Sequence, residues 1–162
     1  MFEHLKNKRV LVTGPQRSGT TICARMIAHD ADLVYIDEDQ VGIDNRTLVN
    51  DLFATRKGFV LQAPAVSRWC QKIKADVVVF MVRPVEDIIK SQDQIKWACE
   101  EIERSKYRGE PGPIAQVKYD YWYNEQKPKI DNHIEVNFKD LEGHPLFVKN
   151  RVGFSARQWK RG

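Results

Sequence analysis

Residues 9–27, RVLVTGPQRSGTTICARMI, lie near the start of the 162-residue chain and decide its fold. Residues 9–13 form an apolar, β-branched run, which predicts a buried strand. The glycine-flanked turn GPQRSGTT follows at once as residues 14–21, and residues 22–27 then have helical spacing. Strand, turn and helix in this order form the context in which a GxxxxG motif predicts a phosphate-binding loop.

The two glycines of this turn make an anion site possible. Gly14 and Gly19 permit backbone angles and a close approach of the main chain that a side chain would block. The amides of residues 17–21 can then converge on an anion at the positive end of the helix. A glycine turn that only caps the helix is the alternative. The residues expected to contact the anion are Gly14, Arg17, Ser18, Gly19, Thr20 and Thr21.

The turn differs from the Walker A loop of ATPases. In a Walker A loop a lysine follows the second glycine and contacts the β- and γ-phosphates, but Thr20 stands there in this chain. The most apolar strand, residues 76–82, ends in Arg83 and not in an aspartate that could bind magnesium. An ordinary ATPase or kinase is therefore not the first expectation.

The rest of the chain alternates between apolar runs and helical spacing, which predicts βαβ units and a mostly parallel sheet. Residues 76–82 are apolar without alternation, as in a central strand, whereas residues 134–138 alternate, as in an edge strand. The expected fold is α/β: a P-loop three-layer sandwich with a mostly parallel five-stranded sheet, helices on both faces, and one domain over residues 1–162. The strands are expected at residues 9–13, 33–36, 58–61, 76–82 and 134–138.

Residues 15–21, PQRSGTT, closely resemble the 5′-phosphosulfate loop of sulfotransferases, whose cosubstrate is 3′-phosphoadenosine 5′-phosphosulfate (PAPS). In that family a basic residue before Ser-Gly-Thr-Thr replaces the Walker lysine, and Arg17 occupies its position. Residues 82–91, VRPVEDIIKS, are similar to the family's 3′-phosphate motif. The resemblance implies that Arg83 and Ser91 hold the 3′-phosphate of PAPS. A surface ion pair for Arg83 and an ordinary exposed position for Ser91 are the alternatives.

The resemblance also implies a reaction: sulfuryl transfer from PAPS to a hydroxyl or amine of a small-molecule or glycan acceptor. Several family members use a glutamate just after strand two as the base, which implies Glu38 here, with Asp37 and Asp39 as alternatives and Arg17 as the second catalytic residue. An acidic loop or helix cap is the other interpretation of this cluster. Many relatives end strand three with a lysine that stabilises the sulfonate, whereas Gln62 stands there and brings no charge.

Several features leave more than one interpretation open. The aromatic residues of segment 119–123 either line an acceptor cleft or pack in the core. The segment 135–141 is weakly similar to a late strand of the sulfotransferases, and the basic tail, residues 151–161, either covers the 3′-phosphate or is a frayed terminus. Helical spacing extends from Val85 to Ile102.

Three functions remain in competition. The first is a PAPS-dependent sulfotransferase. The second is a kinase-like or nucleoside-triphosphate-binding protein that uses Arg17 and the acidic residues 37–39 with magnesium. The third is a non-catalytic nucleotide-binding domain.

Composition limits the other classes. The net charge of +4 favours anionic partners, but no nucleic-acid motif accompanies it. No apolar run reaches the roughly 20 residues of a membrane span. Three scattered cysteines and an N-terminus without a leader pattern favour the cytoplasm, with the cysteines as buried free thiols. His29, His133 and His144 lack metal-site spacing, so no metal is expected.

Overall fold

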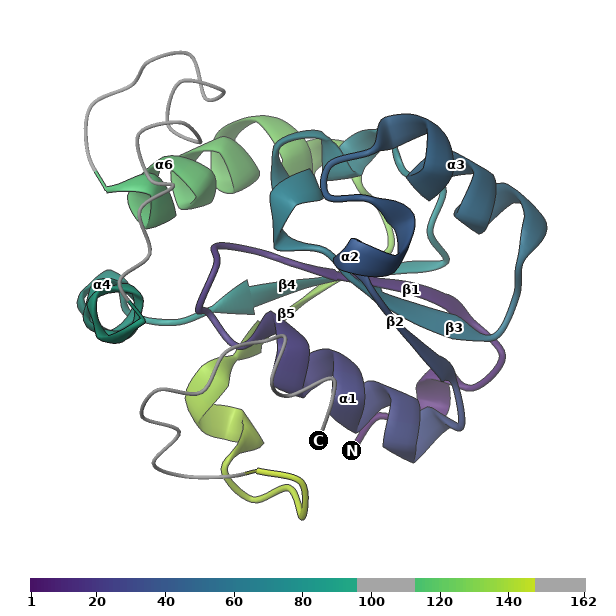
Figure 1. The fold of residues 1–162 in the computed structure, drawn as a ribbon, viewed down its shortest axis with the longest axis horizontal. Coiled ribbons are helices and arrows are strands. Elements are labelled where there is room, and N and C mark those ends of the chain that lie inside the picture. Colours follow the sequence, from purple (N-terminus) through teal and green to yellow (C-terminus); the bar gives the residue numbers. More distant parts are fainter. Residues whose placement is uncertain (96–112, 148–162) are drawn as a thin grey trace.

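The computed structural model describes residues 1–95 and 113–147. Its centre is a five-stranded sheet in which all neighbouring strands are parallel, in the order β2-β3-β1-β4-β5 (Figure 1). The α/β prediction is confirmed, and the fifth strand lies at an edge, as its alternation indicated. The strands are β1 (Arg9–Thr13), β2 (Val34–Asp37), β3 (Phe59–Gln62), β4 (Val77–Val82) and β5 (His133–Asn137).

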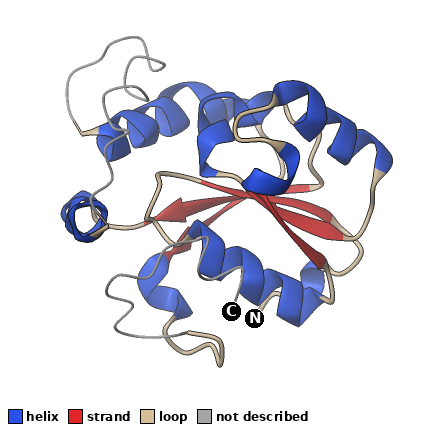
Figure 2. Ribbon diagram, viewed as in Figure 1, coloured by secondary structure: helices blue, strands red, loops and turns tan. Residues whose placement is uncertain are grey.

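Helices cover both faces of the sheet (Figure 2). In Figure 1, α1 (Thr20–Ala31) lies on one face and α3 (Arg46–Thr55) and α6 (Ile114–Tyr121) lie on the other. The short α2 (Glu38–Val41) shares the face of α3, and α4 (Val85–Gln94) lies beyond the end of β4. The expected three layers are therefore present.

The strands supply a core to each layer because successive side chains point to opposite faces. On β4, Phe80 packs in the layer of α3 and α6, whereas Val79 and Met81 pack in the layer of α1. Trp122, in the π-helical turn that continues α6, stacks on Phe80 with ring centroids 4.3 Å apart and planes 6° apart. This stack fixes α6 above the middle of the sheet.

All five strands run in one direction, so their carboxyl ends meet at one edge, where ligands of open α/β folds bind. The loop at residues 14–19 leaves β1 there, Asp37 ends β2 and Gln62 ends β3. Arg83 follows β4, and Phe138 follows β5. The residues of the candidate site come from this edge.

Some sequence-based expectations reach beyond the described ranges. The helix after Arg83 is described to Gln94, and its predicted extension to Ile102 lies outside the described residues, as does the basic tail. Cys23 and Cys70 are buried free thiols, as expected, and Cys99 lies outside. Within residues 1–95 and 113–147, no helix combines the length and apolar character that a membrane crossing requires.

Candidate functional site

The loop between β1 and α1 is a tight turn in an unusual backbone conformation. Gly14, Arg17 and Gly19 all have positive φ angles, of 137°, 71° and 103°. A Cβ atom at Gly19 would lie 2.6 Å from a ring carbon of Phe138. Positive φ is rare for a residue such as arginine, and backbone strain of this kind clusters at ligand sites.

Ser18 braces the turn from within. Its amide and its hydroxyl both donate to the carbonyl oxygen of Pro15, at 3.1 and 2.5 Å. The side chain is completely buried. The predicted anion contact of Ser18 therefore has no free donor in this conformation, and the residue instead holds the shape of the loop.

The structure brings together the three side chains that the two sequence motifs singled out. The guanidinium of Arg83 donates to the carbonyl oxygen of Arg17 at 2.8 Å. Nε of Arg17 donates to the hydroxyl of Ser91 on α4 at 2.9 Å. The loop, the end of β4 and α4 thus form one connected cluster, although Arg17 and Ser91 are 74 residues apart in the sequence.

The backbone and side chain of Arg83 are both held in place. The hydroxyl of Tyr119 accepts from the Arg83 amide at 2.9 Å and donates to the Arg83 carbonyl at 2.7 Å. The guanidinium carbon lies 4.2 Å from the centre of the Phe138 ring. Nε of Arg83 is buried and has no hydrogen-bond partner within the described part of the chain. Such a buried donor needs an acceptor, and a bound anion would provide one.

The charges in this cluster favour an anion as well. Burial lowers the pKa of Arg83 and of Arg17, and for Arg17 the neighbouring Arg83 charge acts in the same direction. Both groups lie near the N-terminal end of α1, where the helix dipole already carries partial positive charge. A bound phosphate would offset the burial of the two guanidinium groups, the repulsion between them, and the positive charge at this end of the helix dipole.

Gln62 ends β3 at the position where many sulfotransferases carry a lysine. Its neutral amide could donate a hydrogen bond to an anion there. Instead, its amide oxygen accepts from the Thr20 hydroxyl at 2.8 Å, and its amide nitrogen donates to Asp37 at 3.1 Å. Thr20, Gln62 and Asp37 are all buried. The side chains of Thr20 and Gln62 therefore link the loop to the end of β2, and Thr21 lies half-buried in the first turn of α1.

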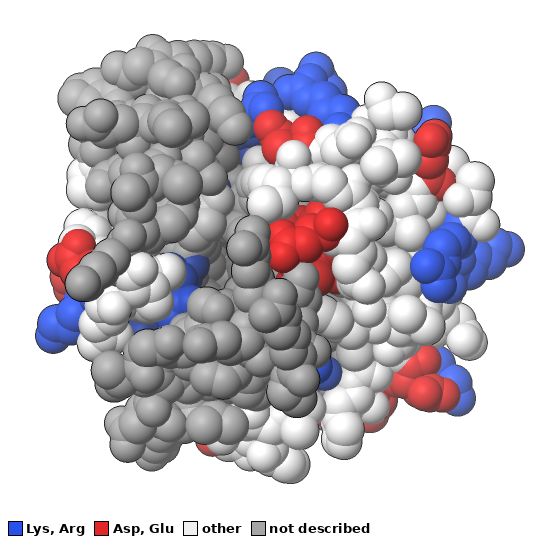
Figure 3. All heavy atoms as spheres, in the orientation of Figure 1, with Lys and Arg blue, Asp and Glu red and all other residues white. Residues whose placement is uncertain are grey.

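The three acidic residues after β2 have separate roles. Asp37 caps α2 by accepting from the Asp39 amide at 3.1 Å, so the helix-cap interpretation applies to it. Glu38 accepts from the Ala65 amide at 3.3 Å. Burial raises the pKa of Glu38 to about 8, helped by the charges of Asp37 and Asp39 and opposed by the Ala65 amide and Lys118. A carboxyl group with this raised pKa suits general acid–base chemistry near neutral pH. Acidic side chains also gather on the surface over α2 in Figure 3.

Lys118 is a residue of this site that the sequence analysis missed. Its side chain is 1% exposed, and its ammonium donates to the Pro64 carbonyl at 3.1 Å and to the amide oxygen of Gln16 in the loop. One signal could have found it. Ala115, Lys118 and Trp122 share one face of the helix by their spacing, and both neighbours are buried.

The aromatic segment after residue 118 packs in the core for the most part. Tyr119 and Trp122 are buried against Phe80, while Tyr123 is exposed and donates to Glu135 at 2.8 Å. The packing interpretation therefore holds for Tyr119 and Trp122. Tyr119 also positions Arg83, which is a second role.

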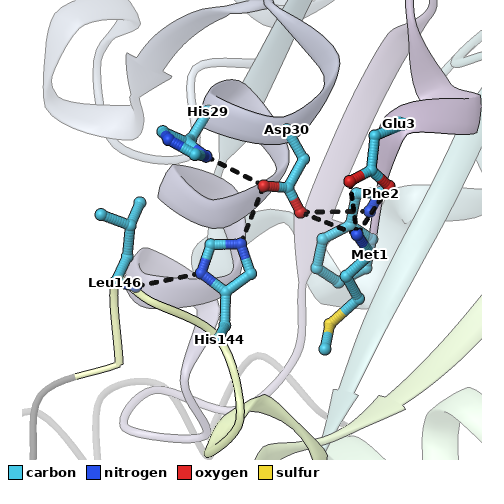
Figure 4. A network of polar contacts seen from close by, with 7 residues as sticks. All are labelled: Met1, Phe2, Glu3, His29, Asp30, His144 and Leu146. Carbon is cyan, nitrogen blue, oxygen red and sulfur yellow. Dashed lines mark hydrogen bonds and ion pairs between the residues drawn. The ribbon is translucent and has the colours of Figure 1, made fainter.

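A further group of polar residues lies at the opposite end of α1 (Figure 4). Asp30 contacts Nδ1 of His29 at 2.9 Å and Nε2 of His144 at 2.8 Å. Nδ1 of His144 accepts from the Leu146 amide at 3.1 Å, so its Nε2 carries the proton donated to Asp30. The ligand atoms of His29, Asp30 and His144 lie within 4.8 Å of one another, close enough to hold a metal ion. The sequence spacing did not indicate this group.

Neither the known protein-family models nor the sequences of curated proteins match this chain. Among solved structures, shikimate kinase from Acinetobacter baumannii in complex with shikimate is similar, with a TM-score of 0.54 and 15% sequence identity over 99% of this chain and 96% of that chain. An uncharacterized protein from Eubacterium ventriosum ATCC 27560 has a TM-score of 0.44 and 9% identity over 80% of this chain and 88% of that chain. The first similarity shows that the two chains share an α/β fold.

Proposed function

We propose that this chain binds a phosphorylated nucleoside cosubstrate at its loop and transfers the terminal anionic group to a small-molecule acceptor. The observation that carries the proposal is the cluster of Arg17, Arg83 and Ser91 at the N-terminal end of α1. Two guanidinium groups, and an Nε of Arg83 that is buried without a hydrogen-bond partner among residues 1–95 and 113–147, make a site whose charge and donors suit a phosphate.

PAPS is the first candidate for the cosubstrate. A 3′,5′-bisphosphorylated adenosine needs two oxyanion sites on one sheet edge. The loop amides would hold its 5′-phosphosulfate, and Arg83 with Ser91 would hold its 3′-phosphate. Support comes from the hydrogen bond between the Arg83 guanidinium and the Arg17 carbonyl, because one nucleotide could reach two groups that lie this close together.

The reaction proposed with PAPS is a sulfuryl transfer. A hydroxyl or amine of the acceptor attacks the sulfur atom, the bond between sulfur and the bridging oxygen of the 5′-phosphate breaks, and 3′,5′-ADP leaves. Glu38 takes the acceptor's proton, and Arg17 offsets charge on the transferring and leaving oxygens. Glu38 suits this role because its pKa is raised to about 8 and its carboxylate lies near Ala65, just after β3.

A kinase-like reaction with a nucleoside triphosphate is the second candidate. The fold similarity to shikimate kinase favours it. A second observation is the position of Asp37, which one glutamine side chain separates from Thr20 at the start of α1. A carboxylate in that place could bind a magnesium ion together with the phosphates of the nucleotide.

Calorimetric titration of the chain separates the two candidates. One titration uses 3′,5′-ADP, and the others use ATP with and without magnesium. We expect 3′,5′-ADP to bind without a metal and more tightly than ATP. Binding of ATP that requires magnesium would favour the kinase-like reaction, and binding of neither nucleotide would refute the proposal. Binding of 3′,5′-ADP without transfer from PAPS to any offered alcohol or amine would indicate a non-catalytic nucleotide-binding domain.

A further inference from the structure

We propose that Tyr119 on α6 is a positioning residue that gives this site its preference for a 3′-phosphate, because its hydroxyl holds Arg83 in place. The inference rests on the proposed function, in which Arg83 binds that phosphate. The Tyr119 hydroxyl accepts from the Arg83 amide at 2.9 Å and donates to the Arg83 carbonyl at 2.7 Å. A single hydroxyl, 36 residues away in the sequence, therefore contacts both polar groups of the Arg83 main chain.

The Arg83 main chain benefits from such a partner because the chain leaves the sheet at this point. Val82 and Asn137 form the last residue pair between β4 and β5, so Arg83 lies one residue beyond that ladder. Pro84 follows as the residue before α4, and a residue that precedes proline is restricted to extended conformations. Part-buried backbone groups need hydrogen-bond partners. The Tyr119 hydroxyl thus helps to fix the direction in which Arg83 leaves the sheet.

Other contacts orient the guanidinium of Arg83 and leave one nitrogen for a ligand. The guanidinium donates to the Arg17 carbonyl at 2.8 Å, and its carbon lies 4.2 Å from the centre of the Phe138 ring. Nε is buried and finds no hydrogen-bond partner in either described range of the chain. With its main chain held by Tyr119, this donor is fixed before a ligand arrives. A preorganised donor binds more tightly because less conformational freedom is lost on binding.

Tyr119 is itself held in the core, and its hydroxyl keeps its proton. The residue is 7% exposed, and its ring packs edge-on against Phe80 with the centroids 6.0 Å apart. Burial raises the pKa of Tyr119 to about 12, although the hydrogen bond to the Arg83 main chain and the Arg83 charge lower it. The hydroxyl can therefore donate to the Arg83 carbonyl at neutral pH. A phenylalanine would fill the same space, so core packing alone does not require the hydroxyl.

The test compares Tyr119→Phe with Tyr123→Phe. Each substitution removes one hydroxyl and keeps the ring, but the Tyr123 hydroxyl contacts Glu135 at an exposed position away from Arg83. Calorimetry measures the affinity of each variant for 3′,5′-ADP and for 5′-AMP. We expect Tyr119→Phe to weaken 3′,5′-ADP about five- to ten-fold and to leave 5′-AMP unchanged. Tyr123→Phe should change neither affinity.

A double variant distinguishes a positioning role from a general effect on the fold. If Tyr119 acts through Arg83, adding Tyr119→Phe to Arg83→Met should weaken 3′,5′-ADP no further than Arg83→Met alone does. Hydrogen exchange provides a readout that needs no ligand. The Arg83 amide should exchange faster in Tyr119→Phe and at an unchanged rate in Tyr123→Phe.

The possible failures of the inference and of the proposed function can be told apart. If Tyr119→Phe weakens 3′,5′-ADP and 5′-AMP equally or weakens neither, Tyr119 only packs α6 against the sheet, and the inference is wrong while the proposed function stands. The same conclusion follows if Tyr119→Phe has an equal effect with and without the Arg83 guanidinium, or if the exchange of the Arg83 amide does not change. If the unaltered chain binds 3′,5′-ADP no more tightly than 5′-AMP, the proposed function with PAPS is wrong, and the inference is wrong with it.

Discussion

The two ends of α1 differ in the charged side chains that surround them and in how these are partnered. At the C-terminal end, Asp30 contacts two imidazoles, from His29 and His144 (Figure 4). At the N-terminal end, the guanidinium groups of Arg17 and Arg83 gather where the helix dipole is already positive. The first end places proton-donating imidazoles at the negative end of the dipole, whereas the second adds like charge to the positive end.

This difference separates a structural cluster from a candidate binding site. Burial alone would raise the pKa of Asp30, but hydrogen bonds from His29, His144 and the Phe2 amide hold it well below its ordinary value. That end is thus stabilised by contacts within the protein. The other end has lowered arginine pKa values and a buried Nε on Arg83 without a partner among the described residues. It would gain its missing stabilisation from an anionic ligand.

The largest effect should come from Arg83→Met, which removes the charge but keeps an apolar chain against Phe138. Truncating one side of a buried charged pair costs about 2–5 kcal/mol, or about 30-fold to several thousand-fold in affinity. We expect this loss for 3′,5′-ADP and little loss for 5′-AMP, which lacks the 3′-phosphate. Isothermal calorimetry measures both affinities.

Arg9→Met is the matched control for this comparison. Arg9 lies at the amino end of β1 and pairs with Asp76 at 2.9 Å, far along the strand from the loop. Its loss should leave nucleotide affinity unchanged. Equal losses for 3′,5′-ADP and 5′-AMP in Arg83→Met would show that Arg83 does not read the 3′-phosphate, and the contrast between the two ends of α1 would lose its functional meaning.

Gly19→Ala should have the next largest effect, on folding. The new Cβ would lie 2.6 Å from Phe138, and φ at this position is 103°. Left-handed backbone costs about 1–2 kcal/mol for a residue with a Cβ, and overpacking adds about 1–3 kcal/mol. Urea unfolding should therefore show that the free energy of unfolding falls by about 2–5 kcal/mol.

Gly58→Ala tests the origin of that loss. Gly58 also has a positive φ, of 66°, but a Cβ there would meet nothing within 4 Å. Gly58→Ala should therefore lower the free energy of unfolding only by the cost of the left-handed backbone, about 1–2 kcal/mol. If the two variants are equally destabilised, the contact between the loop and Phe138 does not constrain the site.

The fold and part of the site could be predicted because their signals are local. The loop at residues 14–19 lies directly between a strand and a helix, and Arg83 directly follows the most apolar run. Arg83 and Ser91 are eight residues apart, so their common position beside Arg17 depends on one strand end and one helix. Such short-range relations can be recognised in the sequence without knowledge of the tertiary structure.

The remaining site residues depend on contacts between distant segments. Lys118 and Gln16 are 102 residues apart, and His144 and Asp30 are 114 apart. No periodicity in the sequence pairs such residues. Gln62 was correctly placed at a strand end, but its amide could turn either to the anion or to Thr20 and Asp37, and only the packing around it decides between them.

The smallest effect should come from Asp30→Asn, at the other end of α1. This change removes the charge that His29 and His144 contact, and it should cost about 1–2 kcal/mol at neutral pH. The pKa of Asp30 is lower in the folded than in the unfolded chain. Its contribution to the free energy of unfolding is therefore complete above the unfolded pKa, about 4. This contribution is lost as the pH falls below that value toward the folded pKa. The stability difference between the unaltered chain and the variant should therefore shrink in acid.

Chemical unfolding at several pH values between about 2 and 7 measures this difference, since the ordinary carboxyl pKa lies within that range. Asp32→Asn is the control, because Asp32 is an exposed residue at the same end of α1. Asp30→Asn should leave the affinity for 3′,5′-ADP unchanged, since Asp30 lies at the far end of the helix from the loop. A loss of nucleotide affinity would mean that the two ends of α1 are coupled, and that the cluster around Asp30 does more than stabilise the fold.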